Sequence, residues 1–171
     1  VTKLDVSTLA PINILFGGSP CQSLSTSGKQ EGFAGKSGLF FEYVRIFKEL
    51  KALNPNLLFL LENVKMKKEW QEVITNELGV EPIFINSSLL SAQNRQRLYW
   101  TNIPNVTVPA DKGILLKHIL ESGFVDRDKS YCIDANYFKG GNLNQYLEKS
   151  RRQLLFPKQE YLDNAIWNNG P

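Results

Sequence analysis

Residues 12–22 read INILFGGSPCQ, a short apolar run that ends in two glycines and leads through a proline to a cysteine. A run of the length of 12–16 is typical of a buried strand, and Gly17-Gly18 would end it. Cys21 would then follow in a glycine-rich turn. The stretch therefore predicts a strand that delivers a cysteine to the loop beyond its carboxyl end.

The segments that follow alternate between helical and extended patterns. Residues 38–53 carry apolar side chains at three-to-four spacing, which predicts a helix with Ser37 as its N-cap. Residues 57–61 are apolar throughout, as in a strand covered on both faces. The further expected elements are a helix at 66–78, strands at 80–85 and 95–103, and a short helix at 114–120. This order predicts an α/β fold with a doubly wound, mostly parallel sheet.

Two polar side chains are expected at the carboxyl ends of neighbouring strands. Cys21 follows the first strand and Glu62 follows the second directly. Ligands of open α/β sheets bind beyond the carboxyl ends of the strands, so these two side chains are expected to lie close together.

Composition narrows the class of protein. The chain has 171 residues, of which 42% are hydrophobic and 22% charged, with a net charge of +3 and no apolar run of membrane-spanning length. A globular, cytoplasmic protein with two free thiols is expected, because Cys21 and Cys132 lack metal-ligand spacing. The single histidine, His118, has no nucleophile near it in the sequence, which disfavours a histidine-dependent hydrolase. A thiol phosphatase would need an arginine where Ser27 stands.

Three short motifs resemble the DNA (cytosine-5) methyltransferase family and stand in that family's order. They are Pro-Cys-Gln at 20–22, Glu-Asn-Val at 62–64 and Gln-x-Arg-x-Arg at 93–97. Residues 36–42 also resemble the helix that follows the family's mobile catalytic loop. The resemblance implies the fold of an S-adenosylmethionine-dependent methyltransferase of the Rossmann-like type.

The resemblance also implies roles for four residues in the reaction. Cys21 would add to C6 of a flipped-out cytosine, because a thiolate is a strong nucleophile and its addition makes C5 reactive. Glu62 would contact N3 of the ring, where negative charge develops. Arg97 would contact O2 and the phosphate of the target nucleotide, with Arg95 supporting the pocket.

The cofactor and the DNA would contact further residues. S-adenosylmethionine is the expected methyl donor, with Gly18 and Pro20 on the methyl side and Asp5 at the adenine. Double-stranded DNA is the expected partner, and residues 23–36 correspond to the loop that closes over it. The expected DNA contacts are Gln22, Ser23, Ser25, Lys29 and Lys36.

The family's glycine-rich cofactor loop is missing from residues 1–20. The chain is therefore expected to be a fragment or one half of a split enzyme, with a sheet that is incomplete on its N-terminal side and a complementary chain as a partner. Residues 1–122 would form the catalytic part, and 123–171 the start of the target-recognition region or an irregular extension. The alternative is a catalytically inactive methyltransferase-like domain that binds DNA or a partner protein.

Overall fold

The computed structural model describes residues 1–25, 31–133, 146 and 152–169. The chain divides into two compact units. The first contains Val1–Ile85 and Gln96–Val108, and the second contains Asn86–Arg95 and Pro109–Pro171. Each unit is described by itself below. The functional division expected between residues 122 and 123 stays a prediction.

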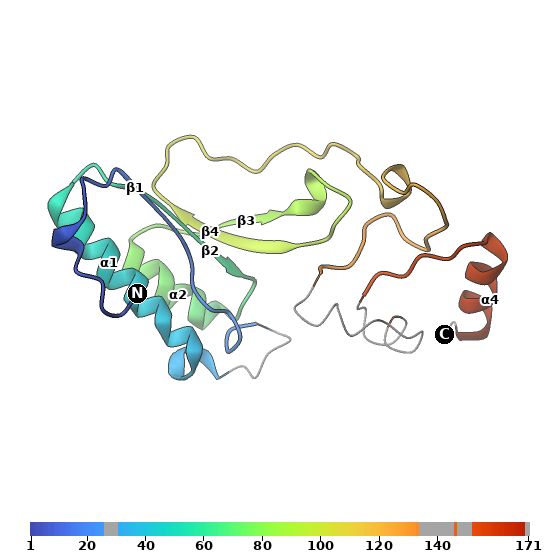
Figure 1. The fold of residues 1–171 in the computed structure, drawn as a ribbon, viewed down its shortest axis with the longest axis horizontal. Coiled ribbons are helices and arrows are strands. Elements are labelled where there is room, and N and C mark those ends of the chain that lie inside the picture. The colour runs from blue at the N-terminus through green and yellow to red at the C-terminus, as the bar shows by residue number, and fades with distance from the viewer. Residues whose placement is uncertain (26–30, 134–145, 147–151, 170–171) are drawn as a thin grey trace. The chain divides into compact units, whose positions relative to one another are not determined.

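The first unit is built on a four-stranded sheet of order β1-β2-β4-β3 (Figure 1). Strand β1 (Ile14–Gly18) pairs in parallel with β2 (Leu58–Val64), and β2 pairs antiparallel with β4 (Gln96–Thr101). Strand β3 (Ile83–Asn86) is at the edge next to β4, as the proline in the expected strand 80–85 indicated. The expected α/β class is confirmed, but the expected mostly parallel sheet is not: only β1 and β2 run parallel, and the sheet is mostly antiparallel because β4 reverses direction beside β2.

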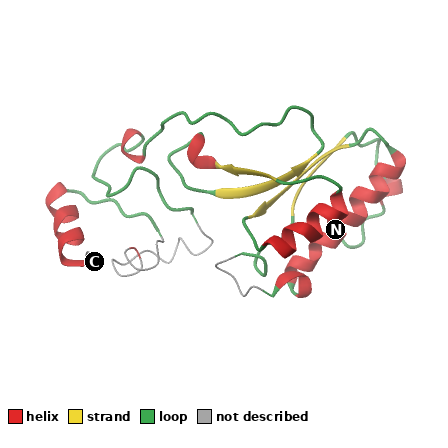
Figure 2. Ribbon diagram, turned by 180° about the vertical axis from the view of Figure 1, so that it is seen from behind, coloured by secondary structure: helices red, strands yellow, loops and turns green. Residues whose placement is uncertain are grey.

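Two helices cover one face of this sheet, and both lie on the same side of the strands in the two views (Figures 1 and 2). They are α1 (Phe40–Leu53) and α2 (Lys68–Leu78), and α2 ends at Gly79, whose φ is 73°. An L-residue with a side chain rarely adopts that conformation, so the glycine stops the helix there.

The core lies between the helices and alternate residues of the central strands. Phe59 and Leu61 of β2 are 1% and 0% exposed, and the ring of Phe47 lies 4.7 Å from that of Phe59. Trp100 of β4 is fully buried and donates its indole N–H to Thr75 Oγ1 at 3.0 Å. Each such side chain contributes ~1.5–3 kcal/mol through burial.

The opposite face of the sheet carries no described helix. Ile14 and Phe16 of β1 are 43% and 63% exposed, although the sequence predicted a buried strand at this position. That expectation was wrong for alternate residues, because the apolar run alone does not show whether both faces of a strand are covered. Glu62 lies on this open face, since Gly18 is its register partner at the end of the Ile14–Gly18 row.

Three expected boundaries differ from the structure. Strand β2 runs on through Glu62 and Asn63 instead of ending before them. Ser37 is not an N-cap, because it is buried inside the 3₁₀ turn Lys36–Leu39, where its Oγ accepts from the amide of Ser23 at 3.2 Å. The helix expected at 114–120 is only the 3₁₀ turn Leu116–His118.

The second unit contains the 3₁₀ turn Ser87–Leu89 and helix α4 (Gln159–Asn169), together with long irregular segments. An arginine organises part of its interior. The guanidinium of Arg127 lies 4.0 Å from the ring centre of Tyr131 and 4.8 Å from that of Tyr146, and it pairs with Asp126. The hydroxyl of Tyr146 also donates to Asp126. Cation–π stacking and charged hydrogen bonds thus replace an apolar core here.

This cluster predicts a pH-dependent stability. Burial raises the pKa of Asp126, but hydrogen bonds from Arg127 and Tyr146 outweigh burial and hold the pKa below its ordinary value of 3.8. A lowered folded-state pKa stabilises the fold above about pH 4, and this contribution is lost as the pH falls through the folded-state value.

We expect Asp126→Asn to lower the free energy of unfolding by about 1–2 kcal/mol at pH 7, because Arg127 then lacks its carboxylate. The difference between variant and wild type should begin to shrink below about pH 4, where Asp126 of the unfolded wild-type chain becomes protonated, and should shrink further as the pH falls through the lower folded-state pKa. Urea unfolding followed from pH 3 to pH 7 measures both effects. A difference that is constant across this range would contradict the role of Asp126.

In the part of the chain that the structure describes, no helix has both the length and the apolar character needed to cross a membrane.

Candidate active site

Strand register brings the expected site residues of the first unit together. Gly18, at the end of β1, is the partner of Glu62 in β2, and Val64 of β2 is the partner of Arg97 in β4. The loop that leads to Cys21 begins directly after Gly18. Cys21, Glu62 and Arg97 lie far apart in the sequence, but they belong to adjacent strands or to the loop that follows β1.

Glu62 and Arg97 form an ion pair. Arg97 Nε lies 2.6 Å from Glu62 Oε1, and the two side chains are 15% and 32% exposed respectively. Nε is buried and makes no well-aligned hydrogen bond, so the contact is chiefly one of opposite charges. The second guanidinium nitrogen, Nη1, donates to the carbonyl of Gln96 at 2.8 Å. A carboxylate and a guanidinium thus stand together on the open face of the sheet.

Asn63 fastens the turn that leads to Cys21. Its side chain is 1% exposed, with Nδ2 donating to Ser19 Oγ at 2.9 Å and Oδ1 accepting from the amide of Val64 at 2.8 Å. A buried amide with both ends satisfied rigidifies what it joins. Asn63 therefore holds Ser19 against β2.

Cys21 is a half-buried free thiol at the start of a hydrogen-bonded turn. Its carbonyl accepts from the amides of Leu24 at 3.0 Å and Ser25 at 2.8 Å. Leu24 is completely buried and anchors the turn in the core. The segment after the cysteine is thus fixed at its beginning, before the undescribed residues 26–30.

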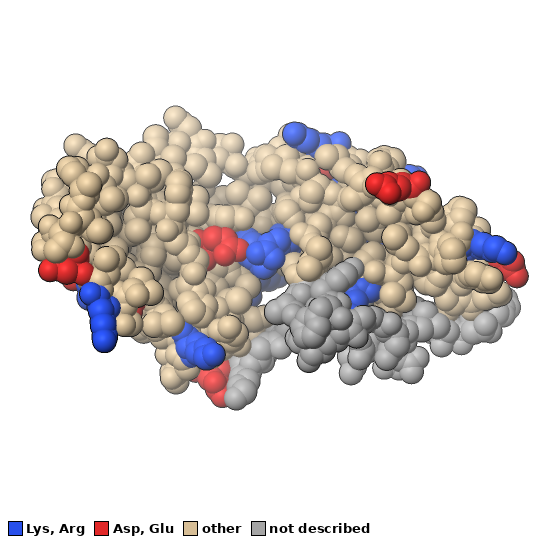
Figure 3. Space-filling model, in the orientation of Figure 1, with Lys and Arg blue, Asp and Glu red and all other residues tan. Residues whose placement is uncertain are grey.

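The expected DNA contacts differ in their exposure. Gln22 and Lys36 are exposed, Ser25 is half-buried, and Ser23 is 5% exposed, so Ser23 is the least suited of these four to meet a phosphate. Lys29 lies outside the described residues. Among the described residues visible in Figure 3, Lys and Arg side chains are scattered and do not gather into one large positive patch.

A cavity of about 320 Å³ opens beside the strand end, and Gly18 and Pro20 line it as expected of cofactor-binding residues. Leu39 and Tyr43 line the same cavity. Neither residue was among the expected site residues, although Leu39 lies within the motif at 36–42. A Cβ at Gly17 would lie 2.4 Å from the ring of Tyr43, so glycine is needed there for α1 to approach β1.

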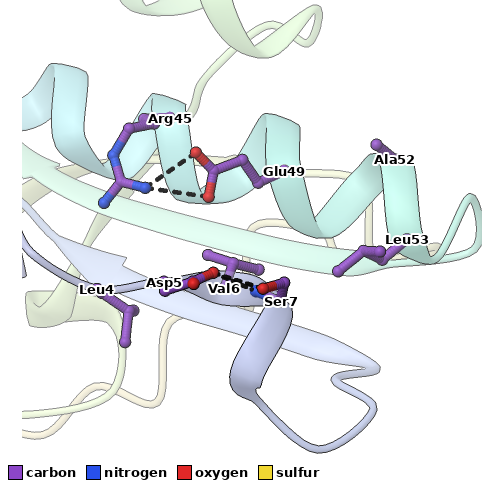
Figure 4. Close-up of a pocket in the computed structure, with 8 residues that line it drawn as sticks. All are labelled: Leu4, Asp5, Val6, Ser7, Arg45, Glu49, Ala52 and Leu53. Carbon is purple, nitrogen blue, oxygen red and sulfur yellow. Dashed lines mark hydrogen bonds and ion pairs between the residues drawn. The ribbon is translucent and has the colours of Figure 1, made fainter.

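Asp5 belongs to a different cavity, between the N-terminal segment and α1 (Figure 4). Its carboxylate accepts from the amide of Ser7 at 3.0 Å and from the hydroxyl of Ser7 at 2.6 Å, and these hydrogen bonds lower the pKa of Asp5. Arg45 and Glu49, paired at 2.9 Å, line the same cavity. The structure thus does not bring Asp5 to the cavity of Gly18 and Pro20. Through its hydrogen bonds with Ser7, the Asp5 side chain caps the 3₁₀ turn Val6–Thr8.

Arg95 belongs to the second unit and lies outside β4, although the sequence predicted it within that strand. Its Nη1 donates to Cys132 Sγ at 3.5 Å, and its amide donates to Asn86 Oδ1 at 3.0 Å. The sequence-based pairing of Arg95 and Arg97 on one strand face is therefore wrong.

A protein family and two known proteins match most or all of this chain. The family model for C-5 cytosine-specific DNA methylase matches residues 1–168. The orphan methyltransferase M.SPRI of Bacillus phage SPR is 34% identical over 99% of this chain and 40% of its own length. The type II methyltransferase M.NgoBV of Neisseria gonorrhoeae is 34% identical over 72% of this chain and 34% of its own length.

A third relative matches a shorter stretch. The type II methyltransferase M1.ScrFI of Lactococcus lactis subsp. cremoris is 39% identical over 58% of this chain and 28% of its own length. The chain thus spans less than half the length of each of these relatives. Its mixed α/β first unit is consistent with the fold of S-adenosylmethionine-dependent methyltransferases. Sequence match and fold lead to one assignment: the chain belongs to the C-5 cytosine-specific DNA methylase family.

Proposed function

We propose that this chain supplies the catalytic portion of a DNA (cytosine-5) methyltransferase. The observation that carries the proposal is the ion pair of Glu62 and Arg97, whose charged atoms lie 2.6 Å apart. Glu62 belongs to β2, which pairs with β1, the strand that leads to Cys21. A nucleophile, an acid and a cation are the groups that addition to a cytosine ring requires. The family uses S-adenosylmethionine, which supplies the methyl group that C5 takes up.

Cys21, Glu62 and Arg97 have different roles in the proposed reaction. The Cys21 thiolate forms a bond to C6 of the extruded base, and the electron pair of the 5,6 double bond becomes available at C5. Glu62 shares a proton with N3, and Arg97 balances the charge that develops at O2. After methylation C5 loses its proton and the Cys21–C6 bond breaks, which restores the double bond and the free thiolate.

The pairing of Glu62 with Arg97 also prepares the site for the base. Two side chains that neutralise each other cost less to keep half-buried than either charge alone. When the ring enters the site, each of the two side chains gives up part of its contact with the other and contacts the edge of the ring instead. A preorganised pair of this kind stabilises the transition state without large rearrangement of the protein.

The cavity beside Gly18 and Pro20 supports a methyl-donor site next to Cys21. Its volume of about 320 Å³ falls within the range of about 300–1,000 Å³ of small-molecule sites. Its lining includes the side chains of Leu39 and Tyr43 together with the glycines at the end of β1, which suits a ligand with an apolar portion. On this basis Gly18 and Pro20 remain the proposed cofactor contacts.

A complementary polypeptide segment is part of the proposal. Within the described residues β1 pairs only with β2, and Ile14 and Phe16 leave apolar area exposed on its open face. An unpaired edge next to exposed apolar side chains favours the addition of another strand. The segment would cover Phe16 and contribute the remaining cofactor contacts.

Covalent trapping tests the proposal. The chain is incubated with a duplex that contains 5-fluorocytosine, with and without S-adenosylmethionine, and adducts are detected on a denaturing gel. Because fluorine replaces the hydrogen at C5 and cannot be removed as a proton is, the elimination that frees Cys21 cannot follow methylation, and the base remains attached to the protein. A parallel series adds the N-terminal part of the phage SPR relative as the complementary segment.

Each outcome has a distinct meaning. A cofactor-dependent adduct with the chain alone indicates that it holds all that catalysis needs. An adduct only after the segment is added supports a catalytic portion that requires a partner. If neither series gives an adduct while the chain still binds duplex DNA, the proposed enzyme is rejected in favour of a catalytically inactive DNA-binding domain.

A further inference from the structure

Lys129, in the second unit, places its ammonium among backbone carbonyls. Its Nζ donates to the carbonyl oxygens of Ser88 at 2.6 Å, Ser91 at 3.2 Å and Ile114 at 2.6 Å. An ammonium has three protons to donate, and three acceptors surround it here. Lysine ordinarily keeps its charge in water, so a half-buried lysine with this set of acceptors is a specific structural feature.

The three carbonyls belong to segments that otherwise have little regular structure. Ser88 and Ser91 lie in and just after the 3₁₀ turn Ser87–Leu89, whose carbonyls lack further helical partners. Ile114 lies in the stretch before the next 3₁₀ turn. Charged hydrogen bonds are stronger than neutral ones, so Lys129 fastens these segments to its own.

Ser130, the residue after Lys129, also holds the segment that contains Gln93. The amide of Ser130 donates to the carbonyl of Ala92 at 2.7 Å, and the carbonyl of Ser130 accepts from the amide of Asn94 at 2.9 Å. Ser130 therefore pairs with both sides of Gln93, the first residue of the Gln-x-Arg-x-Arg motif. Together Lys129 and Ser130 hold the segment that leads into Arg95.

Arg95 depends on the same segment. Its amide donates to Asn86 Oδ1 and its carbonyl accepts from the amide of Ser87, both at 3.0 Å. Its guanidinium contacts Cys132, three positions after Lys129. The backbone of Arg95 thus bonds to Asn86 and Ser87, directly before the Ser88 that Lys129 holds, and its guanidinium contacts the segment of Lys129 itself.

We propose that Lys129 is a positioning residue for Arg95. Its ammonium holds residues 86–95 in the conformation that orients the Arg95 guanidinium. The importance of this orientation for catalysis rests on the proposed function and on the supporting role that the family resemblance implies for Arg95. Loss of the ammonium leaves three carbonyls without their donor and loosens the segment, while the methylene stem of the side chain can be kept.

The first arm of the test does not depend on activity. Lys129→Met keeps the length of the side chain and removes its charge. Hydrogen exchange of the amides of Asn94 and Arg95 is expected to speed up by about tenfold or more, because local opening becomes easier. Amides of α1 should be unchanged. Lys117→Met is the matched control, since Lys117 is an exposed lysine in the same unit.

The second arm measures the trapping reaction in single turnover, with the complementary segment present if the wild type needs it. A lysine that only stabilises the fold would lower the amplitude of trapping and leave its rate constant alone. We expect Lys129→Met to lower the rate constant about 10- to 100-fold, as displaced catalytic groups do. Adding Lys129→Met to Arg95→Ala should then cost little more, because both changes remove the same interaction.

Unchanged exchange at Asn94 and Arg95 would overturn the proposal, as would rate effects of the two substitutions that simply multiply. If the wild-type protein forms no adduct in any series, the proposed function fails, and the exchange arm alone decides whether Lys129 orders the Arg95 segment.

Discussion

Replacement of Cys21 by alanine is expected to abolish covalent capture of a 5-fluorocytosine duplex. Alanine has no nucleophile to add to C6, and water cannot replace a thiolate held next to the base. Because the captured species is held by the Cys21–C6 bond itself, no residual capture is expected, in contrast to hydrolytic enzymes, where water leaves a residual rate. Gel detection of the adduct, in the reaction mixture in which the wild type is competent, measures this effect.

Cys132→Ala provides the matched control because it removes the other half-buried thiol of the chain. Cys132 contacts Arg95 and is expected to affect the rate far less than Cys21 does. Binding of duplex DNA should survive in both variants, since neither thiol carries charge needed for phosphate contacts. Equal loss of the adduct in the two variants would refute the assignment of Cys21 as nucleophile.

Glu62→Gln is expected to slow adduct formation by about 10²- to 10³-fold. The amide keeps the shape of the side chain and an oxygen for Arg97, but it cannot share a proton with N3 as a carboxyl does. The fold should lose only about 1 kcal/mol or less, because the Glu62 side chain is 32% exposed and its ion pair is partly solvated. Single-turnover trapping and urea unfolding separate the two quantities.

Glu69→Gln serves as the control for Glu62→Gln. Glu69 is an exposed glutamate in the first turn of α2, in the same unit as Glu62. Its loss should leave the trapping rate unchanged. A rate for Glu62→Gln within about threefold of the wild type would show that Glu62 is not the acid partner, whereas a large fall in unfolding free energy would indicate a structural role instead.

The local pattern of the chain was enough for most of the secondary structure of the first unit. The helical patterns of 38–53 and 66–78 predicted α1 and α2. These features depend on neighbours within one or two turns of helix. The second unit was harder to predict, because its interior is organised around the guanidinium of Arg127 and not around periodic apolar residues.

An error arose where a distant segment competes for the same residue. Ser37 has the character of an N-cap, but tertiary packing buries it against the amide of Ser23. The hydrogen-bonding capacity of Ser37 is thus used by a partner that a local window of sequence does not identify. Asp5 caps a 3₁₀ turn through its neighbour Ser7, and its contact with the adenine stays a prediction.

The sequence by itself determined the family and supplied the proposed reactive side chains, because motifs such as Pro20-Cys21-Gln22 are chemical signatures that need no geometry. Only the tertiary structure decided that Glu62 lies inside β2, opposite Gly18, and pairs with Arg97 from an antiparallel neighbour. Register between strands is set by hydrogen bonds and packing across the whole sheet, and a shift of one residue would turn every side chain to the other face. The site therefore depends on long-range pairing that no local pattern specifies.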